Sequence, residues 1–387
     1  MAGRKTAADI IVERVGKAPL QSGSREPADP PRRILLACTQ RIGDVLLATP
    51  LARSMQRAWP QAEVDMLVFR GTEGALEGNP DIAQVIVVPR RAGFRERWHE
   101  LRGLWRAYDL AVSPLPTDRA RIYCWAAGRR TCGLLQTKRS DRHKALLLNQ
   151  WRYFDDLDTH TVSMGLALTE LLHIAPSFEV VPPSVSPAQL DGLLAHLAPM
   201  EDKAFAVLHP SPAFAYKMWT PGAWLALARW LKGRDLGVVF TGGPEPGEVA
   251  YVEAIAQQAG GLNLAGRLSL AQTAELIKRT RIYVGPDTVV THIAAATGAP
   301  TIALFGPSNP VKWGPWPKDW ISHDSPWQRR GSGRQGNVFL IQGPGDCVPC
   351  MQEGCERKVD SRSDCLLNLD AGVVISAAAS MLSGRIA

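Results

Sequence analysis

The segment RIYVGPDTVVTHIAAATG, residues 281–298, carries polar residues where a predicted strand gives way to a predicted helix. Thr288 and the backbone N–H group of Val289 would open that helix, and a helix N-terminus is a ready anion site. Asp287 is itself negative, so its carboxylate is better suited to accept hydrogen bonds from sugar hydroxyls than to contact a phosphate. His292 lies four residues after Thr288 and therefore on the same helix face. Taken alone, the motif fits an ordinary capped helix with a buried histidine equally well.

Two further loops follow predicted strands of the same half. The first, LHPSPAFAYKMWTPGAW at 208–224, presents a lysine that could neutralise a diphosphate leaving group without a metal ion. The second, FTGGPEPGE at 240–248, combines a Gly-Gly turn with Glu245 or Glu248 for ribose hydroxyls. Loops that follow parallel strands meet at one edge of the sheet, so together they predict a nucleotide-diphosphate site. These two loops add the candidates Ser211, Lys217, Gly242, Gly243 and Glu245.

In the first half, the stretch TQRIGDVLLATPLARSM at 39–55 follows RILLAC, a run typical of a buried strand. Apolar residues recur at helical spacing from Leu47 to Ala58, so we expect one amphipathic helix with Asp44 at or near its N-cap. A simple cap, worth ~1 kcal/mol, would explain that position. Gly43, however, lets the backbone bring the carboxylate to the carboxyl end of the strand, where open α/β sheets bind ligands. The single glycine argues against a dinucleotide-dependent enzyme, which needs G-x-G-x-x-G.

The chain as a whole, 387 residues with 45% hydrophobic content, is long enough for two cores. Short β-branched runs alternate with helical patterns throughout, which predicts an α/β fold of two Rossmann-like domains facing a central cleft. The expected parts are a flexible tail at 1–31, a first domain at 32–175, a linker at 176–203, a second domain at 204–345, and a Cys-rich segment with a C-terminal helix at 346–387. We expect that last helix to pack against the first domain.

The net charge of +7 is concentrated in one part of the sequence. Residues 90–144 contain 14 Lys or Arg against 5 Asp or Glu. A solvated helix face explains part of this surplus, but such a field also attracts an anionic partner, whether nucleic acid, a membrane surface or a phosphorylated substrate. The sequence has no apolar run long enough to span a bilayer and no signal-peptide pattern, so we expect a cytoplasmic protein.

Two motifs bear on metal ions. DDLD at 155–158 matches the D-x-D pattern that can hold a divalent cation, but it directly precedes a helical run, and we interpret Asp158 as an N-cap instead. Near the C-terminus the spacing C-x2-C-x4-C-x9-C suits a structural Zn or Fe site, with reduced thiols an equally good interpretation. The four candidate ligands are Cys347, Cys350, Cys355 and Cys365.

Three stretches together resemble glycosyltransferase family 9, the ADP-heptose:lipopolysaccharide heptosyltransferases of Gram-negative bacteria. They are RIGDVLLATPLARSMQRAWPQAEVDMLV, KMWTPGAWLALARWL and VGPDTVVTHIAAATGAPTIALFGPSNPVKWG, and the resemblance covers roughly residues 32–370. It implies a GT-B fold and inverting transfer of heptose from ADP-heptose with no catalytic metal or other cofactor. The acceptor it implies is a lipid-linked core oligosaccharide, and the clustered cysteines resemble members that add the second or third heptose.

The resemblance also assigns roles to individual residues. Asp44 matches the catalytic base, and Lys217 matches a lysine near the donor phosphates that acts in catalysis. The helix N-terminus lowers the pKa of Asp44 and desolvation raises it, so we expect the two effects to oppose one another. The donor side further includes the D-T-x-x-x-H residues Asp287, Thr288 and His292, their neighbour Val289, and positions near Ser211 and Leu268. On the acceptor side we expect Arg41, Gly43 and Arg70.

Two alternatives remain open at this point. A family 9 protein O-heptosyltransferase that modifies an autotransporter would share the donor half, although the local positive charge favours a phosphorylated glycolipid and peripheral contact with the inner membrane. A nucleic-acid-binding protein with a cysteine-metal finger would need aromatics interleaved with the basic residues. The block at 90–144 offers only Trp98, Trp105 and Tyr123 in no known pattern, so we expect no nucleic-acid partner. The heptose position built and the oligomeric state are left open.

Overall fold

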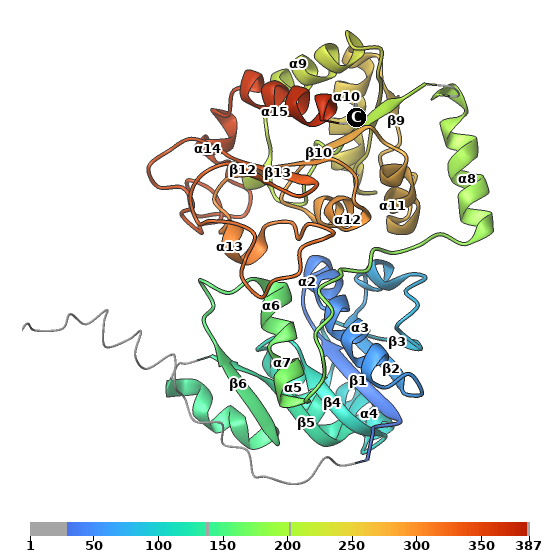
Figure 1. Ribbon diagram of the computed structural model, residues 1–387, viewed down its shortest axis with the longest axis vertical. Helices are drawn as coiled ribbons and strands as arrows, with labels where there is room; N and C mark the ends of the chain where they lie inside the picture. The colour runs from blue at the N-terminus through green and yellow to red at the C-terminus, as the bar shows by residue number, and fades with distance from the viewer. Residues whose placement is uncertain (1–28, 137–138, 201–202, 385–387) are drawn as a thin grey trace, which may run out of the picture. The chain divides into compact units, whose positions relative to one another are not determined.

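The first half of the chain contains a six-stranded sheet, seen in the lower part of Figure 1. The computed structural model describes residues 29–136, 139–200 and 203–384, so most of the tail predicted at 1–31 lies outside the described residues. All strand pairs of this sheet are parallel, in the order β3-β2-β1-β4-β5-β6. The strands are β1 (Arg33–Cys38), β2 (Glu63–Phe69), β3 (Gln84–Val88), β4 (Tyr108–Ser113), β5 (Gly128–Gln136) and β6 (Gln150–Phe154).

The second half forms a seven-stranded sheet of the same kind, in which the first strand of that half, β7, again lies inside the sheet. Its strands run β12-β13-β11-β10-β7-β8-β9, and every pair is parallel except β12 with β13. In each sheet the strand order reverses at one point, next to β1 in the first and next to β7 in the second, and ligands bind at such switch points. The strands are β7 (Phe205–Leu208), β8 (Gly237–Phe240), β9 (Leu262–Asn263), β10 (Ile282–Pro286), β11 (Thr301–Phe305), β12 (Gly333–Gln335) and β13 (Val338–Gln342).

Helices connect the strands and cover both sheets. None of those in the described residues combines the length and apolarity needed to cross a bilayer. The first half has α2 (Ile42–Leu47), α3 (Thr49–Ala58), α4 (Phe94–Leu104), α5 (Asp118–Ala127), α6 (Thr161–Leu166) and α7 (Leu168–Leu171). The rest are α8 (Pro187–Leu197), α9 (Pro221–Lys232), α10 (Pro246–Ala259), α11 (Leu270–Lys278), α12 (Val289–Thr297), α13 (Pro310–Trp313), α14 (Asp364–Leu367) and α15 (Ala371–Ser383).

The alternation of short apolar runs with helical patterns correctly predicts parallel strands joined by helices, but three helical predictions are wrong in detail. The helix expected from Asp44 to Ala58 is divided at Ala48 into α2 and α3, because Pro50 has no N–H to continue the first helix and starts the second. Asp158 does not cap α6, because the cap is His160, whose ring nitrogen accepts the N–H of Val162.

The third correction concerns the C-terminal helix. α15 packs on α9, β10 and β11 of the second half, not on the first domain as predicted. Its buried side chains, Val374, Ala378 and Met381, join the same core as α9. The pattern correctly indicates an apolar face, but it contains no information on which of two sheets that face covers.

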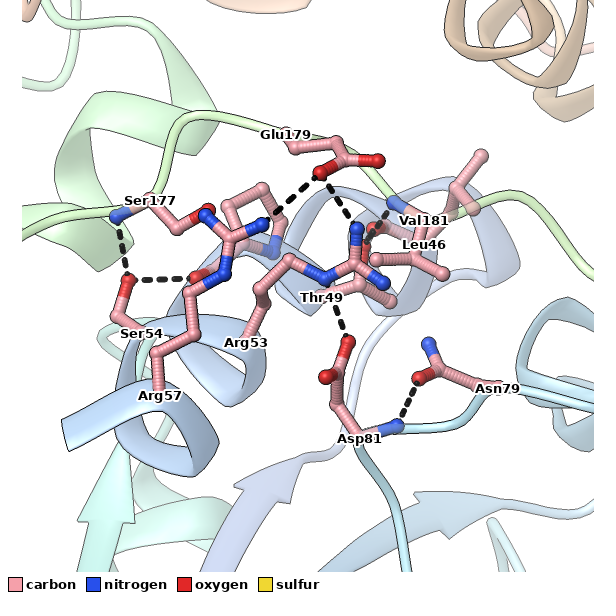
Figure 2. A network of polar contacts seen from close by, with 11 residues as sticks. Leu46, Thr49, Arg53, Ser54, Arg57, Asn79, Asp81, Ser177, Glu179 and Val181 are labelled. Atoms are coloured by element: carbon pink, nitrogen blue, oxygen red, sulfur yellow. Dashed lines mark hydrogen bonds and ion pairs between the residues drawn. The ribbon is translucent and has the colours of Figure 1, made fainter. Parts of the chain in front are cut away.

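The chain passes from the first half to the second along α3, where a polar network holds it (Figure 2). The backbone N–H groups of Ser177 and Val181 donate to the hydroxyls of Ser54 and Thr49, both on α3. Arg53, one turn further along the helix face, bridges two acids. Further on, α8 packs on α11 of the second half.

Arg53 has a matched neighbour that gives a test of this network. Arg53 Nε lies 2.7 Å from Asp81 Oδ2 and its Nη1 lies 2.5 Å from Glu179 Oε2, with 14% of the side chain exposed. Arg57 also reaches Glu179, at 3.4 Å, but is 62% exposed. We expect Arg53→Ala to lower the free energy of unfolding by roughly 2–4 kcal/mol, because the mostly buried Asp81 loses its partner, and Arg57→Ala by less than about 1 kcal/mol. Equal losses in urea denaturation would contradict this account.

Candidate functional site

A cleft of about 920 Å³ lies at the carboxyl ends of strands from both sheets. From the first half it is lined by the loop after β1, the start of α2 and Leu115 and Pro116 after β4. From the second half the loops after β7, β8, β10 and β11 contribute. The predicted site residues that line it are Arg41, Gly43, Asp44, Ser211, Lys217, Gly242, Gly243, Leu268, Asp287, Thr288, Val289 and His292.

Two predicted residues lie outside this cleft. Arg70 is exposed directly after β2, one strand away from the switch point of its sheet. Glu245 is exposed at the residue before α10, and Glu248, one turn later, lines the cleft instead. Glu248 accepts the backbone N–H of Gly243 at 2.9 Å, and a Cβ on Gly243 would lie only 2.4 Å from that carboxylate oxygen. The second glycine of the turn therefore makes room for the acid.

Asp44 occupies the first turn of α2, two residues inside the start of the helix. Its Oδ2 accepts the backbone N–H of Arg41 at 3.2 Å, and the side chain is buried. α2 packs on α12 of the second half, where a Cβ placed on Gly43 would lie 3.9 Å from the ring of His292. The short helix thus holds a carboxylate in the cleft, next to the wall that the second half forms.

The electrostatics of Asp44 follow the predicted opposition. Burial raises its pKa from 3.8 to about 6, while the hydrogen bond from Arg41 and the positive charges of Arg41, Lys312 and Lys217 act in the lowering direction. Desolvation is the larger effect. At neutral pH the group is mostly ionised yet basic enough to accept a proton.

Lys217 and Asp287 form an ion pair in the wall opposite. Lys217 Nζ lies 2.5 Å from Asp287 Oδ2 and also donates to the Asp287 carbonyl at 3.1 Å, and the hydroxyl of Ser308 donates to the same carboxylate oxygen at 2.6 Å. Burial alone would raise the pKa of Asp287, but the Lys217 charge and these hydrogen bonds outweigh it and lower that pKa. The Asp287 side chain is 9% exposed and that of Lys217 15%, so the pair is largely withdrawn from water while Lys217 still lines the cleft.

His292 faces the same pair from α12. Burial lowers its pKa to about 4, against the opposing attraction of Asp287, so the ring is neutral at neutral pH. Its Nδ1 is buried and has no hydrogen-bond partner among the residues that the structure describes. Thr288, which precedes α12, does not use its hydroxyl to cap the helix and instead lies 3.4 Å from the hydroxyl of Thr291. His292 and the N-terminus of α12 therefore both lie in the wall of the cleft.

Lys312 was not among the predicted residues. It sits on the short helix α13, lines the cleft, and forms an ion pair with Asp156 of the DDLD loop, which lines the first-half side. Asp158 of the same loop pairs with Arg329. The DDLD acids thus bind basic side chains of the second half, a role that neither a metal site nor a cap predicts. The sequence feature that could have indicated Lys312 is its position in KWG, shortly after the Gly-Pro turn that ends a predicted strand.

The predicted cysteine site is not formed as a metal-binding group. Cys347 and Cys355 are exposed, Cys365 is buried, and all are free thiols. Across residues 29–384, leaving aside the undescribed gaps, no three His, Cys, Asp or Glu side chains lie close enough together to hold a metal ion. The segment nevertheless reaches the cleft, because Met351 donates its backbone N–H to Pro307 at 2.8 Å and lines the wall together with Gln352 and Glu353.

Two Rossmann-like sheets whose switch points face one cleft, with a buried carboxylate on one side and a lysine and a helix N-terminus on the other, define a glycosyltransferase of the GT-B fold. Solved structures support this fold. A glycosyltransferase family 9 protein from Veillonella parvula superposes with a TM-score of 0.73 at 18% identity, covering 94% of this chain and 100% of that one. Escherichia coli ADP-heptose lipopolysaccharide heptosyltransferase II does so with a TM-score of 0.69 at 20% identity, covering 92% and 100%.

The model of glycosyltransferase family 9 (heptosyltransferase) matches residues 104–328, and the chain belongs to this family. Among curated relatives, lipopolysaccharide heptosyltransferase 3 of Escherichia coli is 27% identical over 293 residues, which cover 72% of this chain and 85% of that protein. Lipopolysaccharide heptosyltransferase 1 of Pseudomonas aeruginosa is 27% identical over 335 residues, covering 84% and 87%. The family resemblance inferred from the motifs is confirmed, and the chain is a glycosyltransferase.

The raised pKa of Asp44 predicts a gain in stability when its charge is removed. A carboxyl group with a higher pKa in the folded state opposes folding once it ionises, from pH about 4 upward, and fully above about 6. We expect Asp44→Asn to raise the free energy of unfolding at pH 7.5 by up to about 3 kcal/mol, and by little at pH 4.

Asp109 provides a control of opposite sign. It accepts the N–H groups of Arg33 and Arg32, and the first of these is the main cause of its lowered pKa. Asp109→Asn should therefore lose stability at neutral pH and lose less as the pH falls below the ordinary carboxyl range. Denaturant titrations at pH 7.5 and pH 4 measure the free energy of unfolding of both variants. An Asp44→Asn protein that is less stable than wild type at pH 7.5 would contradict a desolvated, ionised Asp44.

Proposed function

We propose that this protein transfers heptose from ADP-heptose to a phosphorylated, lipid-linked lipopolysaccharide inner core, with inversion at the anomeric carbon and without a catalytic metal. The relatives named above support the heptose and the acceptor class, and the two curated ones are the lipopolysaccharide heptosyltransferases 3 and 1. Addition of the second or third heptose is the finer proposal. The reaction would take place in the cytoplasm at the inner membrane.

The observation that carries this proposal is the opposed placement of Asp44 and Lys217 in one cleft. In the proposed step, an Asp44 oxygen takes the proton of the acceptor hydroxyl while that hydroxyl oxygen bonds to the anomeric carbon. The bond from the anomeric carbon to the diphosphate oxygen breaks, and its electron pair stays on the leaving diphosphate. Lys217 and the first N–H groups of α12 stabilise that negative charge.

On the donor side, Lys217 can serve the diphosphate without leaving Asp287. An ammonium group has three donors, and two of them are used by the carboxylate and carbonyl of Asp287. Asp287 then orients the lysine, and its carboxylate, held ionised, remains available to sugar hydroxyls at its free lone pairs. Glu248 and the His292 ring, which both line the cleft, are further candidates for hydroxyl contacts.

Arg41 is proposed to contact the acceptor. Its guanidinium lies 4.9 Å from the centroid of the Phe214 ring, within the cleft and next to Asp44. Arg70, outside the cleft, would meet a phosphate only on a part of the acceptor that extends beyond it. The alternative acceptor, a polypeptide of an autotransporter, would use the same base and donor site. Incubation with ADP-heptose and defined acceptors of both kinds, followed by mass spectrometry of the products, separates the two.

Substitution of Asp44 tests the base. Asp44→Asn should lower turnover roughly 10²-fold or more while leaving ADP affinity nearly unchanged, because the carboxylate acts on the acceptor proton. Single-turnover rates and calorimetry with ADP measure the two quantities. Turnover close to that of wild type would remove Asp44 from the role.

Substitution of Lys217 tests the diphosphate site. Lys217→Ala should weaken ADP binding and slow transfer together, because the charge is used in the ground state and as the leaving group departs. Lys278→Ala is the control, since Lys278 pairs with Glu275 on the exposed face of α11 and does not line the cleft. ADP affinity that is the same in all three proteins would place the diphosphate elsewhere.

A structural Zn or Fe ion at the four cysteines is a separate proposal. Its support is the ligand spacing in the sequence, since the described side chains are not gathered into a metal-binding group. We expect near-stoichiometric metal by elemental analysis, a lower melting temperature for Cys350→Ser, and transfer activity that survives EDTA. If the protein is fully stable without metal, the four cysteines are reduced thiols and not metal ligands.

A further inference from the structure

Helix α4 leaves large aromatic side chains in solvent. None of its eleven residues is buried, and Phe94 and Trp98 are 86% and 58% exposed. Trp105, at the residue that ends the helix, is 54% exposed. Positions 94, 98 and 105 differ by four and seven, so the three rings share one face of the helix. Exposure of these apolar rings to water is unfavourable in free energy, and a binding partner that covers them would remove that unfavourable term.

The neighbouring helix α5 extends this apolar surface. α4 packs on α5, and the rings of Trp105 and Trp125 meet edge to face with centroids 5.6 Å apart. Trp125 and Ile122, both on α5, are each 40% exposed. We call the five side chains Phe94, Trp98, Trp105, Ile122 and Trp125 the aromatic face.

Arginines flank the aromatic face. Arg95 and Arg102 are exposed on α4, and the guanidinium of Arg106 lies over the Trp105 ring at 5.6 Å. Of the two acids of α4, Glu100 is partly buried and accepts the hydroxyl of Tyr123. Glu96 lies two positions from both Phe94 and Trp98, so it points away from their face. On α5, Asp118 lies one turn before Ile122, but its carboxylate is paired with Arg121 and Lys144. Within the described part of the chain, the unpaired charge that the arginines of α4 and Arg106 bring to the rim is therefore positive.

We propose that the aromatic face, with its arginine rim, docks on an anionic lipid bilayer. Helices that lie in a membrane interface combine Trp or Phe on one side with Arg or Lys beside them, because indole rings favour the headgroup region and guanidinium groups reach the phosphates. The positive rim is complementary to anionic lipids. A second copy of the chain fits less well, since a two-fold contact would place arginines against arginines.

The position of the face connects docking with the cleft. Leu115 and Pro116, which line the cleft, lead directly into α5, whose first turn is capped by the Thr117 hydroxyl. Docking through α4 and α5 thus anchors the half of the molecule that carries Asp44. This inference rests on the proposed function in one respect, because a lipid-linked acceptor is presented at a membrane.

The test is co-sedimentation of the full chain with vesicles of phosphatidylcholine alone, or of equal parts phosphatidylcholine and phosphatidylglycerol. We expect binding to the anionic vesicles that weakens as salt is added. The double variant Phe94→Ser with Trp98→Ser should lower the partition coefficient about 10-fold or more, and so should Arg95→Glu with Arg102→Glu. Matched controls are Ile321→Ser, which removes an exposed apolar side chain of the second half, and Arg281→Glu, which reverses an exposed charge there.

Several results would overturn the inference. These are no vesicle binding by the wild type, equal binding to neutral and anionic vesicles, or equal loss in the controls and in the α4 variants. Self-association that is abolished by the α4 variants without any vesicle binding would assign the face to a second copy. Melting temperatures confirm that each variant folds. Transfer to a deacylated, water-soluble acceptor should be unchanged in the α4 variants, and its failure in the wild type would count against the proposed function alone.

Discussion

The buried carboxylate of Asp44 is the group around which both halves of the molecule are arranged. Asp44 is buried at the start of α2, and that burial raises its pKa to about 6. The backbone hydrogen bond from Arg41, and then the positive charges of Arg41, Lys312 and Lys217, favour the ionised form of Asp44 there. Two of these three cations come from the second half of the chain, so the chemistry of the first half depends on the loops of the second. The burial that makes Asp44 more basic also makes its ionised form destabilise the folded protein.

The second half is held to the first by contacts that surround this group. α2 packs on α12, Lys312 pairs with Asp156, and His160 Nε2 lies 2.8 Å from the carbonyl oxygen of Gly314. Burial lowers the pKa of His160 to about 3, so the ring is neutral and its Nε2 donates while its other nitrogen caps α6. These are polar contacts of fixed geometry, and they position Lys312 next to the cleft.

Sequence patterns predict the parts of this arrangement that depend on local physical chemistry. The apolar runs of β1, β4 and β10, and the Gly-Asp and Asp-Thr turns that follow β1 and β10, mark loops that line the cleft. The sequence does not predict β5 and β6. GRRTCGLLQ has two exposed arginines near its start and QWRYF is a half-buried edge strand, so neither shows a continuous apolar run. Pairings between distant loops, such as Lys217 with Asp287 and Lys312 with Asp156, depend on how the strands are ordered in space, which no local pattern contains.

The most direct test of the central claim is the pH dependence of kcat/KM for heptose transfer, measured for the wild type and for Lys312→Met. A base with the burial of Asp44 predicts an acid limb centred near pH 6, since transfer requires the ionised carboxylate. Removal of the Lys312 charge, which lowers the pKa of Asp44, should move that limb to higher pH, whereas a change in packing alone would lower the rate without moving it. A limb near pH 4, or one that Lys312→Met leaves in place, would contradict the account.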